Sequence, residues 1–380
     1  MSERGDAAKR TIWDAWVETE LDGIRAAGQW RMPRDLDAAG PEGKLAPDGQ
    51  PVVSFASNDY LGLTQHPAVI GAAHAALDRW GAGSGAARLI VGSRPVHHEL
   101  EEALAAWKAS DRAVLFPTGF AANLGVLTTV AGPGTLVCSD ELNHASIVDG
   151  CRLSRAEVAV YDHADVDQLG SLLRSADGRR VVIVTDSVFS MDGDVAPLDG
   201  ITSLCRDSGA LLVLDEAHAV LGPDPDLDGI DALRIGTLSK THGSLGGFVA
   251  TSSRFADLLV NRARSYIFTT APTPADSAAA LASTAILGGP EGDALRARLR
   301  RHVERVRPGH PSPIISIVCG EEDRAIAATD ALLSRGLLVP AIRPPTVAPG
   351  TSRLRVTLSA AHTPEQVDRL VTALHDLGLA

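Results

Sequence analysis

Gly236-Thr-Leu-Ser-Lys240-Thr-His-Gly-Ser-Leu-Gly-Gly247 decides the fold, because it sets a lysine in a turn rich in glycine and hydroxyl groups. The stretch follows Asp215-Glu-Ala-His218, and that tetrad closes the apolar run Ala210–Leu214, which is typical of a buried strand. Polar residues that follow a strand of an α/β sheet lie at its carboxyl edge, where ligands bind. We therefore expect Lys240 and Asp215 to share one site.

The chemistry of this pair points to a cofactor. A lysine amine forms a Schiff base with an aldehyde, and an acid at a strand end can keep a pyridine nitrogen protonated. Lys240 and Asp215 together therefore indicate pyridoxal 5′-phosphate (PLP). His218 follows Asp215 by three positions and could donate to the phenolic oxygen of that cofactor.

Two helix starts and one loop carry further groups of the kind that PLP needs. Thr118-Gly119-Phe120 follows an apolar run and opens a helix, so its backbone N–H groups can meet a phosphate, and Thr237 adds a hydroxyl donor. His144 opens another helix, where an imidazole can stack on a flat ring. Ser190, in the loop Ser187–Pro197, is predicted to lie at the same sheet edge.

Each motif also has another interpretation. Gly81-Ala-Gly83-Ser-Gly-Ala86 matches the dinucleotide fingerprint of nicotinamide dehydrogenases, but the helical pattern Pro67–Trp80 precedes it where a strand is required. Asp215–His218 is also typical of a helicase box, yet the phosphate loop that such an enzyme needs is missing upstream. From local pattern alone, Asp215 and His218 could be a structural pair, and His144 a core histidine.

Composition is that of a soluble globular enzyme. The chain has 380 residues, 45% hydrophobic and 22% charged, which favours one large and one smaller domain. Its net charge of −12 disfavours nonspecific binding to nucleic acid or to an anionic membrane. The N-terminal residues lack an apolar signal core, so we expect a cytoplasmic protein.

Cysteine usage argues against metal or disulfide chemistry. No Cys-x-x-Cys pair occurs, and we expect no metal and four small buried thiols. These residues are Cys138, Cys151, Cys205 and Cys319.

Alternating strand-like runs and helical patterns predict an α/β fold with a mostly parallel sheet covered by helices on both faces. The strand-like runs are Ala113–Phe116, Thr135–Cys138, Val158–Tyr161, Val181–Val184, Leu211–Leu214, Ile235–Leu238 and Phe248–Thr251. Clear helical patterns are Thr11–Ala27, Pro67–Trp80, Arg94–Ala109, Ala294–Arg307 and Pro364–Leu377.

We divide the chain into an N-terminal helix and connection (1–50), a large PLP-binding domain (51–282) and a small C-terminal α+β domain (283–380). Asp37–Gln50 is rich in glycine, proline and charge, and is expected to be a surface connection.

The ordered motifs resemble the α-oxoamine synthases, a family of PLP fold type I with the fold of aspartate aminotransferase. The resemblance runs from about Trp13 to the C-terminus. It rests on Ser57–Gly62, Thr118–Asn123, His144–Ser146, Phe189–Asp194, Asp215–His218 and Thr237–Lys240.

The resemblance implies a role for each matching residue. Lys240 would bind the cofactor covalently and act as base, Asp215 would pair with the ring nitrogen, and His144 would stack on the ring. Other cofactor contacts would come from Gly119, Phe120, Ser190, His218, Thr237 and, from the partner subunit of a homodimer, Thr270. Arg343 would clamp the carboxylate of the amino-acid substrate bidentately, and Arg31, Asn58 and Thr346 match other substrate-contacting positions.

The segment Ala341–Val347, followed by Arg353–Leu358, resembles one branch of that family. The branch consists of PLP-dependent C-acyltransferases of biotin biosynthesis, which condense L-alanine with a pimeloyl thioester on coenzyme A or acyl carrier protein. Because the motifs around the ring are shared by the whole family, glycine with acetyl-CoA or succinyl-CoA, and serine with a fatty acyl thioester, stay open. A PLP-binding protein without catalysis is a further alternative.

The chain departs from the family pattern at two places. Ala219–Asp226 replaces a longer segment that usually begins His-Gly-x-Gly, and Gly83–Arg88 differs from the common G-S-G-G-S-R. The first change could alter the wall near the acyl entrance, and neither removes a cofactor contact.

Overall fold

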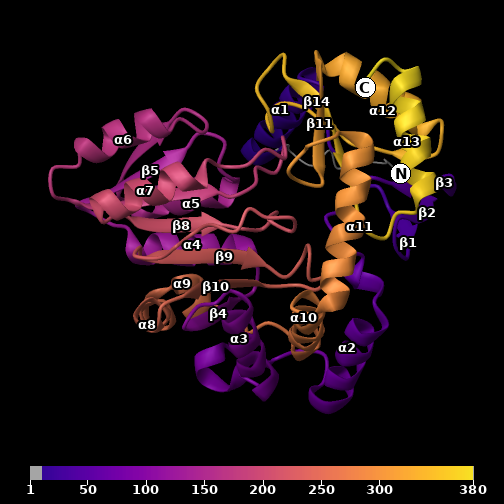
Figure 1. The fold of residues 1–380 in the computed structure, drawn as a ribbon. Helices are drawn as coiled ribbons and strands as arrows, with labels where there is room; N and C mark the ends of the chain where they lie inside the picture. Colours follow the sequence, from indigo (N-terminus) through magenta and orange to yellow (C-terminus); the bar gives the residue numbers. More distant parts are fainter. Residues whose placement is uncertain (1–10, 380) are drawn as a thin grey trace, which may run out of the picture.

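A seven-stranded sheet forms the centre of the computed structural model, which describes residues 11–379 (Figure 1). Its strand order is β4 (Arg112–Phe116), β10 (Gly247–Thr251), β9 (Ala232–Thr237), β8 (Leu211–Asp215), β7 (Arg180–Asp186), β5 (Thr135–Asp140) and β6 (Glu157–Tyr161). The strands from β9 to β6 are parallel, and β10 is antiparallel to both of its neighbours. All seven predicted runs, and the mostly parallel sheet, are confirmed.

Alternate residues of each strand pack on opposite faces of the sheet, because successive side chains of a strand point to opposite sides. Val182 and Val184 of β7 join one hydrophobic cluster, while Ile183 joins another. The first cluster includes α4 (Gly119–Val130), α5 (Ala145–Ser154) and α8 (Ser253–Arg262), and the second includes α6 (Val166–Arg174) and α7 (Leu198–Ser208). Burial on both faces explains why the strands appear as continuous apolar runs.

Four more helical segments complete this part of the molecule. Helix α10 (Pro274–Leu287) packs against α2 (Pro67–Trp80) and α3 (Pro95–Trp107), and α9 (Arg264–Ile267) packs on α4. Helix α2 has the predicted bounds, and it precedes Gly81, so the context for a dinucleotide fingerprint is absent. Two short segments are η1 (Leu63–Gln65) and η2 (Arg88–Gly92).

The C-terminal elements group apart from the large sheet, at the upper right of Figure 1. Strands β11 (Ile314–Gly320), β14 (Ser352–Thr357) and β13 (Ala341–Ile342) form an antiparallel sheet. Helices α11 (Pro290–Val306), α12 (Glu322–Leu333) and α13 (Pro364–Asp376) accompany it. This arrangement agrees with the predicted α+β character of the C-terminal segment.

The expectation that Asp37–Gln50 is only a surface connection is wrong. Strands β1 (Leu36–Ala38), β2 (Glu42–Leu45) and β3 (Gln50–Ser54) form an antiparallel meander, and β12 (Leu337–Leu338) adds to β3 in parallel. The strands are short, β1 has no buried residue and β2 has one, so the polar composition of the segment concealed them. Backbone pairing, rather than an apolar pattern, holds the meander together.

The pairing of β3 with β12 joins the N-terminal meander to the C-terminal segment, which concerns the predicted domain division. That division stays a prediction. Five buried residues from Val53 to Leu63 belong to a hydrophobic cluster whose other buried members lie between Val220 and Leu374. We propose that segment 36–63 belongs with the C-terminal segment, because it shares a sheet and a core with it, and not with the large domain that the sequence assigned from residue 51.

Helix α1 (Ile12–Ala26) confirms the first predicted helix, and Thr11 caps it through a reciprocal pair of hydrogen bonds with Asp14. None of its residues is buried, and Ile12, Trp13 and Trp16 are more than half exposed. All four cysteines are free and buried, as predicted. Within residues 11–379, no helix combines the length and apolarity needed to cross a membrane.

Candidate active site

One cavity of about 230 Å³ lies where the carboxyl ends of the central strands meet the lysine turn. Seven of the nine predicted cofactor-binding residues line it: Gly119, Phe120, His144, Asp215, His218, Thr237 and Lys240. Ser190 and Thr270 are not among its lining residues. The sequence therefore predicted half of the residues that line this cavity, from strand ends, helix starts and the family resemblance.

Asp215 is the last residue of β8, and its carboxylate is held from two sides. Oδ1 accepts from the backbone N–H of Ala217 at 2.8 Å, and Oδ2 accepts from Nδ2 of Asn123 at 2.7 Å. Asn123 comes from α4 and also donates to Ser146 Oγ at 2.9 Å. Because both oxygens are anchored, a buried carboxylate keeps one orientation toward the cavity.

A second acid, Asp186 at the end of β7, lies beside Asp215 in the strand register. Burial raises the pKa of Asp186 well above its usual range, and the neighbouring charge of Asp215 raises it further. Its Oδ2 accepts from the backbone N–H of His144 at 2.8 Å. Burial also lowers the pKa of His144, so a neutral imidazole stands at the start of α5.

Lys240 begins a chain of hydrogen bonds that runs through the cavity wall. Its Nζ lies 2.8 Å from Nε2 of His218, whose Nδ1 lies 2.5 Å from the Tyr60 hydroxyl. That hydroxyl donates to Oδ1 of Asn58 at 3.1 Å. Lys240 Nζ donates to Nε2 of His218, so Nε2 is the acceptor of the neutral ring. The proton of His218 is therefore assigned to Nδ1.

Burial is the largest influence on the pKa values of Lys240 and His218 in this row of hydrogen bonds. It lowers the pKa of Lys240, although the charges of Asp215 and Asp186 oppose the shift. It lowers the pKa of His218 well below the usual range, helped by the positive charges of Lys240 and Arg355. His218 is therefore a neutral acceptor, and the lysine amine releases its proton more readily than an exposed one.

The start of α4 forms a cradle for an anion. Thr118 caps the helix by accepting from Ala121 N at 3.0 Å, so Gly119 and Phe120 are the first two residues, whose N–H groups have no partner within the helix. A Cβ on Gly247 would lie 2.4 Å from the carbonyl carbon of Thr118, so only glycine allows this approach. Thr237 Oγ1, 2.8 Å from Ser239 Oγ, adds hydroxyl groups nearby.

The donor set of the cavity fits PLP. It offers an amine for the aldehyde, an anchored carboxylate for the ring nitrogen, and unpaired N–H groups with hydroxyls for the phosphate. A nearby neutral imidazole, His144, stands beside Phe120 with the ring centroids 6.5 Å apart. These groups follow four different strands, and each of them suits a different part of PLP.

The remaining predicted residues lie outside the cavity lining. The backbone carbonyl of Ser190 accepts from Nε of Arg355 at 2.5 Å, and Thr270 is exposed after α9. Arg343 lies 3.7 Å from Glu322 and donates to the carbonyl of Gly28 at 3.2 Å. Arg31 and Thr346 are exposed. The substrate roles of these residues stay predictions.

Arg355 is a buried guanidinium close enough to Lys240 and His218 for its charge to lower the pKa of both, although it does not line the cavity itself, and sequence reasoning missed it. It is 7% exposed and donates to Asn58 Oδ1 at 3.2 Å and to Thr357 Oγ1 at 2.9 Å. The signal was the alternation along β14, where Leu354 and Val356 enter the core and Arg353 and Arg355 take the opposite face. Asn123, Tyr60 and Asp186 were also missed as site residues.

The fold and this cavity define a PLP-dependent enzyme of fold type I. Residues 50–374 match the family described as aminotransferase class I and II. A curated relative named putative 8-amino-7-oxononanoate synthase, from Desulforudis audaxviator, is 46% identical over 94% of this chain and 97% of its own length. One named 8-amino-7-oxononanoate synthase, from Methylobacterium sp. (strain 4-46), is 46% identical over 97% of both chains.

Solved structures agree. Serine palmitoyltransferase from S. paucimobilis, with bound PLP, has a TM-score of 0.89 at 29% identity and covers 98% of this chain and 100% of its own. 8-Amino-7-oxononanoate synthase from Francisella tularensis has a TM-score of 0.72 at 27% identity and covers 86% of this chain and 98% of its own. The chain belongs to the α-oxoamine synthase family, within which its sequence groups with the 8-amino-7-oxononanoate synthases.

Proposed function

We propose that the protein condenses L-alanine with a pimeloyl thioester and releases carbon dioxide, giving 8-amino-7-oxononanoate and the free thiol carrier, a step of biotin biosynthesis. The observation that carries this proposal is the 46% identity, over 97% of this chain, with a relative of that name. A match of this extent spans the cavity and the C-terminal sheet together. The reaction class is that of a C-acyltransferase.

PLP is the cofactor, and named residues would hold it. Lys240 would bind the aldehyde carbon, Asp215 would keep the ring nitrogen protonated, and the N–H groups of Gly119 and Phe120 would receive the phosphate. When bound, PLP supplies an aldehyde that condenses with amines and a ring that accepts an electron pair from the substrate carbon. His144, at the start of α5, would cover one face of the ring.

Lys240 is the base at the substrate carbon. Because burial lowers the pKa of its amine, more of the amine is neutral than on a surface lysine. A neutral Nζ can take the Cα proton of L-alanine and later return a proton to the same carbon of the product. His218, 2.8 Å away and neutral, offers Nε2 as an acceptor that orients the amine.

Arg355, rather than Arg343, is the residue that we propose for the carboxylate of L-alanine. Its positive charge lowers the pKa of both Lys240 and His218, so it lies within electrostatic range of the amine. The hydrogen bonds of Arg355 go to Ser190, Thr357 and Asn58, and none of these three acceptors is a carboxylate. Arg343 already faces Glu322, which would compete with an anionic substrate.

The residues around Asp215 and Lys240 do not by themselves distinguish one activity of the family from another. The serine palmitoyltransferase backbone has a TM-score of 0.89, higher than the 0.72 of the Francisella synthase. The two solved structures are similarly identical in sequence, 29% and 27%, but curated relatives named 8-amino-7-oxononanoate synthase reach 46%, which favours that assignment. Side chains at the substrate contacts, which identity measures, decide specificity, whereas the backbone is shared by the family.

A substrate grid tests the proposed function. L-alanine, glycine and L-serine would each be combined with pimeloyl, acetyl, succinyl and palmitoyl thioesters of coenzyme A, and with pimeloyl-acyl carrier protein, and the products identified by mass. The expected result is 8-amino-7-oxononanoate from L-alanine and a pimeloyl thioester. Turnover confined to glycine or L-serine would assign the protein to another member of the family.

We further propose a homodimer in which Thr270 reaches the phosphate site of the partner. Thr270 is exposed and stands outside the cavity of its own chain, next to Phe268, which is 70% exposed. Helix α1 likewise presents Trp13 and Trp16, both more than half exposed in the described part of the chain. Such apolar exposure is typical of surfaces that a second protein copy covers.

A further inference from the structure

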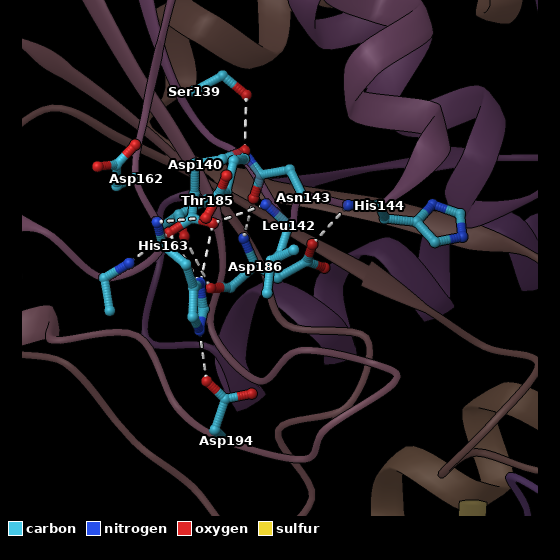
Figure 2. A network of polar contacts seen from close by, with 12 residues as sticks. Ser139, Asp140, Leu142, Asn143, His144, Asp162, His163, Thr185, Asp186 and Asp194 are labelled. Carbon is cyan, nitrogen blue, oxygen red and sulfur yellow. Dashed lines mark hydrogen bonds and ion pairs between the residues drawn. The ribbon is translucent and has the colours of Figure 1, made fainter. Parts of the chain in front are cut away.

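His163 forms two ion pairs, one from each ring nitrogen (Figure 2). Nδ1 lies 3.0 Å from Oδ1 of Asp140, the last residue of β5, and Nε2 lies 2.6 Å from Oδ2 of Asp194 in the loop after β7. The edge of the ring packs on Phe189 at a centroid distance of 4.4 Å and an angle of 90°. The imidazole thus connects β5 to the loop that follows β7.

Both nitrogens must carry a proton for these contacts, because carboxylates only accept. The hydrogen bonds that His163 donates to Asp140 and Asp194 raise its pKa to about 10 against the opposing effect of burial. A histidine in this setting is a fixed cation at neutral pH. Charge-assisted hydrogen bonds of this kind are stronger than neutral ones.

The loop that His163 holds is folded tightly on itself. Phe189 N donates to the carbonyl of Asp194 at 3.0 Å, and Gly193 N donates to the carbonyl of Phe189 at 2.8 Å. Gly193 has φ +74°, and a Cβ there would lie 1.9 Å from the carbonyl oxygen of Ile314 in β11. The loop therefore fits between the large sheet and the C-terminal sheet with no room to shift toward β11.

The same loop also contacts β14 through two arginines of that strand. Asp192 pairs with Arg353, and the carbonyl of Ser190 accepts from Nε of Arg355. Arg355 thus depends on the loop for one of its contacts, and the loop depends on His163 for its tie to β5. The path from His163 to Arg355 consists of Asp194, the turn of the loop and the Ser190 carbonyl.

We propose that His163 is a positioning residue of the reaction: it clamps the loop 187–194 so that the Ser190 carbonyl fixes the Arg355 guanidinium where the carboxylate of the amino-acid substrate binds. This inference rests on the proposed function for the identity of that substrate and for the role of Arg355 in binding its carboxylate. Removal of the clamp should weaken amino-acid binding and leave thioester binding unchanged, because the contacts that start at His163 lead through the loop to Arg355.

The test compares four variants of the PLP-loaded enzyme. His163→Phe removes both hydrogen bonds and keeps a ring against Phe189, whereas His163→Gln keeps a donor without a charge. Asp194→Asn keeps the fold contacts and weakens one ion pair. His98→Phe is the matched control, because His98 is exposed and its pairing with Glu102 lies away from the cavity.

Three measurements distinguish positioning from mere stability. Titration with L-alanine, followed by the visible absorbance of the cofactor, gives the Kd; steady-state kinetics give KM for each substrate and kcat; amide hydrogen exchange reports the opening of residues 187–197. We expect His163→Phe to raise the Kd and KM for L-alanine by about tenfold, which is ~1.4 kcal/mol. KM for the thioester should stay within about twofold.

The loop amides should exchange faster in His163→Phe, His163→Gln should fall between it and wild type, and His98→Phe should match wild type. If His163→Phe does not fold, Asp194→Asn carries the same prediction with a smaller effect. Unchanged L-alanine affinity with a loosened loop, or an unchanged loop, would overturn the proposal. A wild-type enzyme that binds L-alanine but makes no oxononanoate would refute the proposed function instead, and the clamp would still be tested by the binding and exchange measurements.

Discussion

Lys240 Nζ and His218 Nε2 lie 2.8 Å apart in a cavity that lowers the pKa of both groups. Two buried bases that compete for one proton cannot both be charged, and the imidazole, whose pKa falls further below its usual range, remains neutral. The amine therefore has a neutral acceptor beside it that orients it without repelling it. This relationship makes the lysine available as a nucleophile and as a base.

Lys240→Ala should abolish turnover, by a factor of at least about a thousand, because no other amine lines the cavity to act as base. PLP should bind to the variant only without a covalent link. Borohydride reduction of the wild-type enzyme, followed by peptide mass analysis, should place the label on Lys240. A label on any other lysine would remove Lys240 from this role.

Tyr60→Phe should lower kcat about tenfold with little change in KM for L-alanine, because loss of a hydrogen bond to a buried ring costs ~1 to 2 kcal/mol of orientation. The hydroxyl of Tyr60 lies 2.5 Å from His218 Nδ1 and accepts the proton that this nitrogen carries when Lys240 donates to Nε2. Tyr161→Phe is the control, since the Tyr161 hydroxyl is buried without a hydrogen-bond partner in residues 11–379. Equal rates for the two variants would contradict the role of Tyr60.

Most residues that local pattern suggests for the cofactor line the cavity together, whereas those suggested for the substrate do not line it, for a physical reason. Lys240, Asp215 and Gly119 each follow a strand of one parallel sheet, and the carboxyl ends of such strands meet wherever the sheet forms. Asn58 and Arg355 meet across 297 residues, through a contact between the loop after β3 and strand β14 that no strand pattern encodes. Arg343 was chosen from its motif, although the fold turns it toward Glu322.

Arg355→Gln should raise KM for L-alanine by about a hundredfold, because a guanidinium that binds a carboxylate in a buried site contributes ~2 to 3 kcal/mol. Arg343→Gln should change that KM by less than about threefold, as expected for an arginine whose partner is a protein carboxylate. Steady-state kinetics with L-alanine varied at fixed thioester measure both. The reverse order of effects would restore the sequence-based assignment to Arg343.

His163 should make the free energy of unfolding depend on pH in a defined direction. Its pKa is about 10 in the folded protein, against about 6.5 in an unfolded chain. The stabilisation is therefore fully present below about pH 6.5 and is lost as pH rises toward about 10. Denaturant unfolding of wild type and His163→Phe at about pH 6 and about pH 9.5 should show a larger gap at the lower pH. A gap that is constant or grows with pH would show that His163 is not an ion-paired cation.

Substrate choice is the prediction that depends most on residues outside the cofactor site. L-alanine with pimeloyl thioester should exceed glycine with acetyl-CoA in kcat/KM by at least about tenfold, or ~1.4 kcal/mol in transition-state binding. The segment from Ala219 is short here, and Val220 packs into the core that also holds Tyr60, so the wall on that side belongs to the fold and is not an open gap. Competition assays with both substrate pairs in one mixture measure the ratio directly. Comparable or greater use of glycine with the short thioester would leave the α-oxoamine synthase family in place and overturn the particular reaction.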